Sequence, residues 1–316
     1  MVQAPVARSS HRKATPTGGG IGIFLAALIV CLILAGGDRV MTGLCGLGTL
    51  IAVLGLIDDR TPLPSRVRFP VQVCAVSAAV FLSGSAVLLG GEIYSVLWLG
   101  AFLLLTLAGT WWVNLFNFMD GIDGIAGQQA VMMLVSAMLA IWINGTPLNP
   151  LWWMMAAVAM STLSFLAFNW PPARIFMGDV GSTFLAFMLL CFALVSMPSG
   201  WMTLPQWLLL ASFFATDATL TLLVRFFRGE NVTQAHRSHA YQRLSRRSGG
   251  ASRVTAAVAT FNLVVVMPLS VFLPASPFAA FGIVIVVYAF LAMICLWAGA
   301  GLPDEEPGGH WRRERG

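Results

Sequence analysis

The segment VLWLGAFLLLTLAGTWWVN (Val96 to Asn114) contains no charged side chain. About 20 apolar residues are enough to cross the hydrocarbon core of a bilayer as a helix. The chain contains about ten such segments, two of them short. We expect them near Ile21 to Gly36, Val40 to Ile57, Phe69 to Leu89, Val96 to Asn114, Ile125 to Ile143, Leu151 to Ala167, Gly181 to Met197, Trp207 to Val224, Val254 to Leu273 and Phe278 to Ala298.

The composition agrees with a chain surrounded mostly by lipid. Of the 316 residues, 58% are hydrophobic and only 10% are charged, and the mean hydropathy is +0.83. Soluble domains are about one quarter charged. The sequence therefore predicts an all-α polytopic membrane protein with about ten transmembrane helices.

The basic residues predict the orientation in the membrane. All but one of the 18 Lys and Arg residues fall in loops or termini on one side, and Arg39 lies on the other. The positive-inside rule then places both termini in the cytoplasm. We expect a cytoplasmic segment at residues 1–20, a transmembrane catalytic domain at 21–299 and a disordered cytoplasmic tail at 300–316. The positive-inside rule explains the net charge of +5, so this charge gives no reason to expect nucleic acid binding.

Five acidic residues stand at the predicted cytoplasmic ends of different spans: Asp58, Asp59, Asp120, Asp123 and Asp179. Carboxylates crowded at the edge of a low-dielectric region repel one another. A hard divalent cation relieves that repulsion most simply. Mg²⁺ commonly takes one or two protein carboxylates together with substrate phosphates, so the group predicts a magnesium and phosphate site.

Two of the acidic motifs also have structural interpretations. The pair Asp58 and Asp59 ends a span and could be a solvated cap. Asp120 and Asp123 are spaced to share one helix face, among glycines at 121, 124 and 127. Packing of small residues explains those glycines but leaves the two acids and two nearby asparagines, Asn114 and Asn117, without a role.

The segment Phe168 to Ser182 precedes another span. A helix N-terminus presents free N–H groups, so Gly178, Gly181 and Ser182 could bind phosphate while Asp179 holds the metal that bridges it. The structural alternative, an N-cap role for Asp179, is compatible with metal binding.

The largest basic loop runs from Arg225 to Arg253. His236 and His239, with Arg225, Arg228 and Arg237, form a candidate clamp for a nucleotide diphosphate. The alternative is a basic loop that lies on anionic headgroups. Asp217 lies inside the preceding span, and we expect Arg225 or Arg228 to pair with it.

With these motifs in order, the chain resembles the polyprenyl-phosphate N-acetylhexosamine-1-phosphate transferases, from about Arg8 to Leu244. The resemblance rests on five segments: His11 to Gly20, Gly55 to Asp59, Asn117 to Gly124, Phe176 to Ser182, and the histidine loop. The form His236-Arg237-Ser238-His239 looks closer to the branch that initiates lipopolysaccharide O-antigen than to the peptidoglycan translocase.

The resemblance implies transfer of N-acetylhexosamine 1-phosphate from a UDP-sugar to undecaprenyl phosphate at the bacterial inner membrane, as the first membrane step of a cell-envelope glycan. It implies that Asp179 binds Mg²⁺, with Mn²⁺ as an alternative ion. Asp58 or Asp59 would position or deprotonate the lipid phosphate, and His236 with His239 would meet the diphosphate. The other implied roles are a nucleotide site shaped by Asp120 and Asp123, and substrate contacts from Lys13, Asn117 and Asn169. A homodimer is compatible with the resemblance.

The sequence departs from the family pattern at two places. A hydrophobic span usually precedes the Pro16 to Gly19 segment, whereas twenty polar residues precede the first span here, so either the true start lies upstream or this chain dispenses with that helix. The lysine that usually follows the paired aspartates is absent, and Arg66 and Arg68 are the nearest replacements.

Two other classes of membrane protein also carry buried acids. A CDP-alcohol phosphotransferase requires an Ala-Arg pair after its second Asp-Gly, but Ile125 to Gln128 stands there. A cation-coupled transporter would place acids near mid-bilayer in both halves, whereas the five aspartates are expected at one face.

Overall fold

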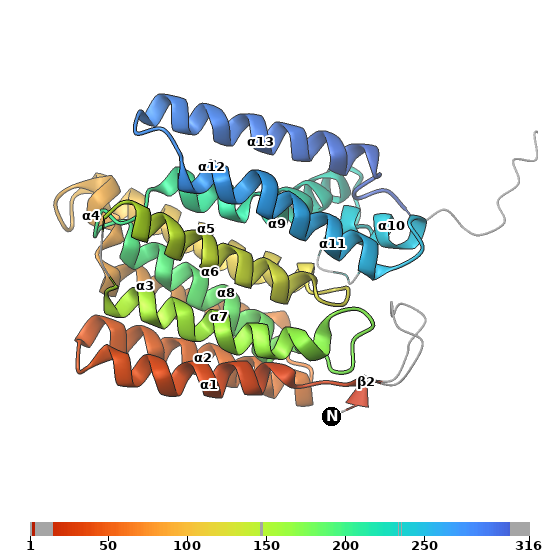
Figure 1. The fold of residues 1–316 in the computed structure, drawn as a ribbon, viewed down its shortest axis with the longest axis horizontal. Coiled ribbons are helices and arrows are strands. Elements are labelled where there is room, and N and C mark those ends of the chain that lie inside the picture. Colours follow the sequence, from red (N-terminus) through yellow and green to blue (C-terminus); the bar gives the residue numbers. More distant parts are fainter. Residues whose placement is uncertain (1, 4–14, 146–147, 233, 235, 304–316) are drawn as a thin grey trace, which may run out of the picture.

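The computed structural model describes residues 2–3, 15–145, 148–232, 234 and 236–303. Figure 1 shows a bundle of long helices that run roughly parallel or antiparallel to one another. The elements are β1 (Val2–Gln3), β2 (Thr15–Pro16), α1 (Gly19–Ala35), α2 (Arg39–Arg60), α3 (Ser65–Ser83), α4 (Ser85–Gly90), α5 (Val96–Met119), α6 (Ile125–Ile143), α7 (Pro150–Asn169), α8 (Asp179–Ser196), α9 (Leu204–Phe227), α10 (Ala240–Arg247), α11 (Ala251–Phe261), η1 (Asn262–Val266), α12 (Met267–Val271) and α13 (Pro277–Trp297).

The helix content confirms the predicted fold class. Within the described ranges, nine helical segments are long and apolar enough to cross a membrane, and α1 is a shorter apolar helix. The short strands β1 and β2 pair antiparallel near the N-terminus. The segment from α11 to α12 forms one span of this set, and it contains the π-helical turn η1 just before Pro268. Proline lacks the N–H that a regular helix needs, which is a common cause of such a distortion.

The observed helices differ from the predicted spans most clearly at two places. The span expected at Phe69 to Leu89 is divided at Gly84, whose φ of 69° belongs to the left-handed region that glycine adopts readily. Helix α5 continues from the predicted end at Asn114 to Met119, so its last turn carries Asn117 towards Asp120.

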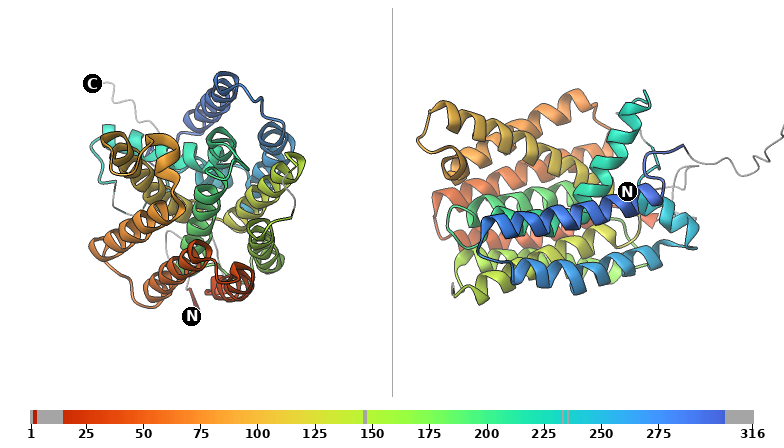
Figure 2. Two further views of the ribbon diagram at one scale, coloured as in Figure 1. Left: turned by 90° about the vertical axis from the view of Figure 1, so that its left-hand side faces the viewer. Right: turned by 90° about the horizontal axis from the view of Figure 1, so that it is seen from above.

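Helix α8 lies at the centre of the bundle. Almost all of its side chains are buried, whereas the outer helices expose many apolar residues. It packs against α1, α2, α3, α5, α6 and α7. The end-on view of Figure 2 shows this arrangement, with the mid-green helix α8 near the middle of the bundle. A central helix lets one N-terminus meet residues from several neighbours.

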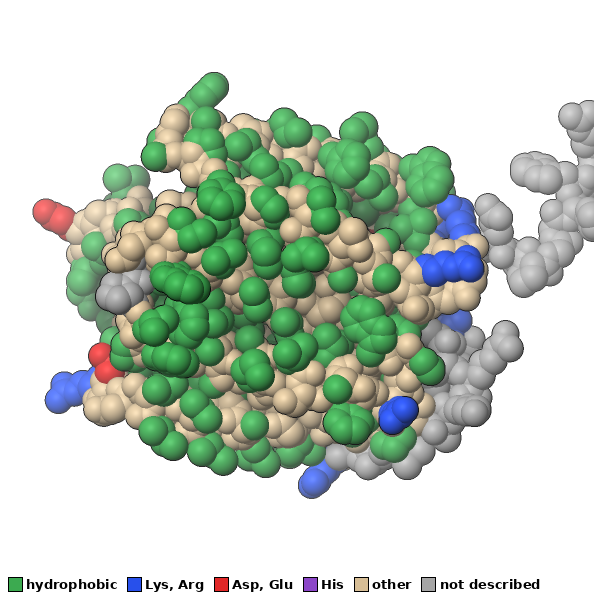
Figure 3. All heavy atoms as spheres, viewed as in Figure 1, with side chains coloured by type: hydrophobic (Ala, Val, Ile, Leu, Met, Phe, Trp, Pro, Cys, Tyr) green, Lys and Arg blue, Asp and Glu red, His purple; other side chains and the backbone are tan. Residues whose placement is uncertain are grey.

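We call the end of the bundle where α2 and α5 finish, and where α6 and α8 begin, the motif end. It is on the right in Figure 1, together with β2 and α10. Figure 3 shows hydrophobic side chains over the flank of the bundle and most of the visible Lys and Arg side chains at the motif end. This charge distribution agrees with the loop bias in the sequence.

Candidate active site

Asp59 joins α2 to the first turn of α8. Its Oδ1 accepts a hydrogen bond from the N–H of Asp179 at 2.8 Å, and its Oδ2 accepts from the N–H of Val180 at 3.1 Å. A carboxylate in this position satisfies free N–H groups and favours the positive end of the helix dipole. The structural alternative, an N-cap role for Asp179, does not hold, because Asp179 is the first helical residue and Asp59 supplies the cap.

The small residues at the start of α8 allow close packing with the neighbouring helices. Gly178 has a φ of 76°, and a Cβ there would lie 2.6 Å from Asp59 Oδ2. Gly181 packs against the backbone of Gly20, and the buried hydroxyl of Ser182 donates to the carbonyl of Gly178. Gly178 and Gly181 thus allow close packing of this segment against α2 and α1, and the phosphate contacts of Gly178, Gly181 and Ser182 stay a prediction.

Asp58 and Asp179 lie side by side and share a cation. Nη1 of Arg68, on α3, contacts Oδ2 of Asp58 and lies 3.3 Å from Oδ2 of Asp179. The other oxygen of Asp58 accepts from the N–H of Leu63 at 2.6 Å. The Asp58 side chain is only 7% exposed, whereas that of Asp179 is 32% exposed. Arg68, and not the exposed Arg66, therefore takes the position nearest the paired acids.

Asp120 follows α5 and brings a further carboxylate to the same place. Its N–H bonds to the carbonyl of Asn117 in the last helical turn, and both residues are half-buried. Burial raises the pKa of Asp120 well above its usual value, and the negative charges of Asp179, Asp59 and Asp123 raise it further. The carboxylates of α2, α8 and the loop between α5 and α6 are thus close enough to influence one another.

Asp123 and Asn169 hold the loops of the motif end together. Oδ2 of Asp123 accepts from the N–H of Ala173 at 2.9 Å. The buried side chain of Asn169 accepts from the N–H of Gly124 and donates to the carbonyl of Ile175. The structure therefore gives Asn169 a scaffold role, and its contact with substrate stays a prediction.

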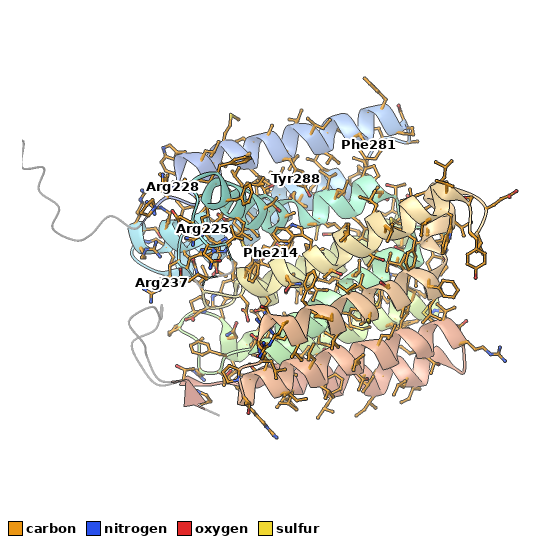
Figure 4. All side chains as sticks on the ribbon, turned by 180° about the vertical axis from the view of Figure 1, so that it is seen from behind. Phe214, Arg225, Arg228, Arg237, Phe281 and Tyr288 are labelled. Atoms are coloured by element: carbon orange, nitrogen blue, oxygen red, sulfur yellow. The ribbon has the colours of Figure 1, made fainter. Side chains whose placement is uncertain are left out.

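The arginines of the long loop bind within the protein. Arg225 is buried, pairs with Glu230 at 2.8 Å and donates to the carbonyl of Asn231, while exposed Arg228 contacts Glu230 at 3.2 Å. Figure 4 shows Arg225, Arg228 and Arg237 together at the motif end. The predicted pairing of Asp217 with Arg225 or Arg228 is wrong, because Glu230 takes both arginines.

Asp217 instead anchors the segment that carries the histidines. Its buried carboxylate accepts from the N–H groups of Ala240 and Tyr241, at 2.9 and 2.8 Å, and from the hydroxyl of Thr221 at 3.0 Å. Nδ1 of His239 lies 3.5 Å away. A buried carboxylate with several donors is well compensated, and it fixes the start of α10 against α9.

Replacing Asp217 with Asn is expected to destabilise the protein by about 1–3 kcal/mol, because the amide has one acceptor oxygen and turns its NH₂ towards a backbone donor. Thermal unfolding in detergent measures the effect. Thr221→Val removes a single donor to the same carboxylate and should cost less. Equal stability of Asp217→Asn and the unmodified protein would show that this anchor is unimportant.

His236 and His239 lie close together in front of α10. Their ring centroids are 4.8 Å apart, and Nδ1 of His236 lies 3.0 Å from the hydroxyl of Ser238. Burial, together with the charges of His239 and Arg225, lowers the pKa of His236 to about 4, against an opposing effect of Asp217. His236 is therefore neutral at pH 7 in this arrangement and offers hydrogen bonds instead of a positive charge.

This shift predicts a pH dependence of stability. Between the ordinary His pKa of 6.5 and the folded value of about 4, the unfolded chain binds more protons than the folded one. The contribution of His236 is thus complete above pH 6.5 and is lost as the pH falls towards 4. We expect His236→Gln to show a smaller decrease of Tm between pH 7 and pH 5 than the unmodified protein. Parallel Tm curves would contradict this.

Tyr241 links the histidine segment to the Asp120 loop, a role that the sequence analysis did not predict. Its buried hydroxyl donates to the carbonyl of Phe118 at 2.9 Å, and a Cβ on Gly121 would lie 2.0 Å from that hydroxyl. Thr255 of α11 donates to the carbonyl of Asp123. A lone tyrosine within a polar, basic segment is the sequence signal that could have indicated this contact.

Comparison with known proteins adds independent evidence. The model of glycosyl transferase family 4 matches residues 41–197. A probable undecaprenyl-phosphate N-acetylglucosaminyl 1-phosphate transferase of Bacillus subtilis (strain 168) is 30% identical over 254 residues, which are 77% of this chain and 69% of that protein. The chain belongs to glycosyl transferase family 4. This result confirms the resemblance to the polyprenyl-phosphate hexosamine-1-phosphate transferases.

Other relatives of this transferase match over a smaller share of their length. A phospho-N-acetylmuramoyl-pentapeptide-transferase of Chlamydia trachomatis serovar L2 is 32% identical, with 55% of this chain and 59% of the relative covered. A decaprenyl-phosphate N-acetylglucosaminephosphotransferase of Mycobacterium leprae (strain TN) is 34% identical, with 60% and 52% covered. The chain thus spans little more than half the length of these two relatives.

The carboxylates of Asp58 and Asp179 are oxygen ligands of the kind that a hard cation prefers. Among the described residues no three His, Cys, Asp or Glu side chains form a complete metal cage. Asp58 and Asp179 nevertheless already hold one positive group between them, and Asp179 is partly exposed. Mg²⁺ is often bound by one or two carboxylates, with water and substrate phosphates completing its shell. These two residues therefore fit a magnesium ion, whereas both oxygens of Asp59 are occupied by α8.

Predicted residues outside the described ranges have no observed position. Lys13 is one of them, and residues 304–316 of the predicted tail are others.

Proposed function

We propose that this transferase moves N-acetylhexosamine 1-phosphate from a UDP-sugar to undecaprenyl phosphate. An oxygen of the lipid phosphate attacks the sugar-linked phosphorus, the bond between the two phosphates of the donor breaks, and UMP leaves. The product is an undecaprenyl-pyrophosphoryl sugar. The observation that carries the proposal is the gathering of Asp58, Asp120 and Asp179 from separate parts of the chain at one end of the bundle.

The proposed roles separate side chains that can contact substrate or metal from side chains whose hydrogen bonds hold the backbone in place. Asp179 and Asp58 would hold Mg²⁺, which would neutralise charge on the phosphate oxygens during transfer. Asp120, which is near enough to Asp179 to be influenced by its charge, would shape the donor site. His236 and His239, neutral and close together, would donate hydrogen bonds to the diphosphate. Asp59, Asp123, Asp217 and Asn169 would keep these groups in place.

The names of the relatives support the lipid acceptor and the sugar phosphate. The basic motif end supports a cytoplasmic active site in a bacterial inner membrane, where UDP-sugars are available. The form of the histidine segment favours a lipopolysaccharide glycan as the product. An arrangement with its five motif carboxylates at one end favours an enzyme over a cation-coupled transporter.

The experiment that tests this proposal uses purified protein, undecaprenyl phosphate, Mg²⁺ and a panel of labelled UDP-sugars. We expect label from one UDP-N-acetylhexosamine in a lipid-extractable product, with one UMP released for each product molecule, and no product with EDTA. Absence of lipid-linked label with every donor, from protein that is folded and monodisperse, would contradict the proposal. Release of UDP in place of UMP would show a different bond cleavage.

A further inference from the structure

Arg68 places a positive charge directly between the two carboxylates assigned to the metal. It lies in the second turn of α3, where its Nη1 contacts Asp58 and approaches Asp179. The Arg68 side chain is 36% exposed, so it has space to move towards the solvent side of the site. Arg66, two residues earlier, is exposed and gives a matched control.

A small pocket adjoins this ion pair. It lies between α2, α3 and α8, opens to solvent, and is lined at one end by Asp58, Arg68 and Asp179. Its wall on α2 continues through Leu54 to Ile51, roughly 10 Å along the helix axis from Asp58. The lining thus combines charged side chains at one end with apolar side chains along α2, which is the chemistry that the two parts of a phosphate monoester with a hydrocarbon chain would meet.

We propose that Arg68 is an exchangeable counter-ion: it neutralises Asp58 and Asp179 in the free protein, a divalent cation displaces it, and it then binds the phosphate of the acceptor lipid. This inference rests on the proposed function for the identity of the acceptor.

The exchange follows from the charges. Two carboxylates cannot bind a guanidinium and a divalent cation through the same oxygens, and the two cations repel each other at such a distance. Arginine binds phosphate through paired N–H groups, so a displaced Arg68 gains a new partner when the lipid is present. Metal and lipid would thus favour the same position of the side chain.

The first test measures Mn²⁺ binding without substrates, by electron paramagnetic resonance of the purified protein. Arg68→Gln removes the competing charge, so it should bind Mn²⁺ at least about tenfold more tightly than the unmodified protein. Arg66→Gln should bind like the unmodified protein. Equal or weaker binding by Arg68→Gln would overturn the inference. Unmodified protein that binds no Mn²⁺ would overturn the metal assignment and the inference together.

The second test measures the acceptor. For Arg68→Gln, the KM for undecaprenyl phosphate should rise at least about tenfold while the KM for the UDP-sugar stays unchanged. Arg68→Lys should retain part of the acceptor affinity, and the uncharged Arg68→Met replaces Arg68→Gln in both tests if the latter does not fold. An unchanged acceptor KM, with normal product formation by the unmodified protein, would refute the role of Arg68 and leave the proposed function intact. Failure of the unmodified protein to make product would refute the proposed function, while the Mn²⁺ titration would still test the counter-ion.

Discussion

Asp179→Asn is expected to reduce product formation by about 100-fold or more. The substitution keeps the size of the side chain but removes the negative charge that would hold Mg²⁺, and metal stabilisation of a phosphoryl transition state amounts to several kcal/mol. The fold should persist, because the backbone N–H of Asp179, and not its side chain, makes the bond to Asp59. Initial rates at saturating substrates measure the effect.

Asp38→Asn provides the control for this experiment. Asp38 caps α2 at the opposite end of the bundle through a bond to the N–H of Met41, and asparagine caps helices about as well as aspartate. We expect normal activity from this variant. Unchanged activity of Asp179→Asn, together with unchanged Mg²⁺ dependence, would remove Asp179 from the metal site.

Gly55→Ala is expected to displace the paired aspartates from α8. A Cβ at Gly55 would lie 2.6 Å from the carbonyl oxygen of Asp179 and 2.7 Å from the nitrogen of Val180. Both contacts are with backbone, which cannot rotate away, so α2 and α8 must separate. Overpacking of this kind costs about 1–3 kcal/mol, and separation would also lengthen the bonds from Asp59 to α8. Lower Tm and at least about tenfold lower activity should appear together.

The same helix supplies a control for the added methyl group. A Cβ at Gly46 would have no neighbour within 4 Å. Because alanine is a better helix former than glycine, Gly46→Ala should be neutral or slightly stabilising. If Gly55→Ala behaves like Gly46→Ala in both measurements, close contact between α2 and α8 is not needed for the site.

Most of the fold could be predicted from the sequence because the residues of each transmembrane span are sufficient to identify it. A run such as Val96 to Asn114 needs no knowledge of its neighbours to be recognised as a membrane helix. The errors occurred where a single residue changes the backbone, as at Gly84. The placement of Asp58, Asp120 and Asp179 near the ends of spans was also predictable, since charged residues mark where an apolar run leaves the membrane.

The partners of the site residues could not be predicted in the same way, because they depend on which helices become neighbours. The bond between Asp59 and the N-terminus of α8 joins residues 120 positions apart in the chain. It gives Asp59 a scaffold role, although Asp58 and Asp59 look equivalent in sequence. Likewise, Asp217 has arginines within reach along its own helix, but the N–H groups of α10 lie closer in space.

The central claim is that carboxylates from separate helices form a single site for a metal ion and a nucleotide diphosphate. A structure of the protein with Mn²⁺ and a UDP-sugar, recorded with the anomalous signal of manganese, tests it most directly. The claim predicts one ion bound to a carboxylate oxygen of Asp179, in contact with the diphosphate and with Asp58 and Asp120 around the same space. Manganese bound away from Asp179, or a nucleotide at the opposite end of the bundle, would contradict it.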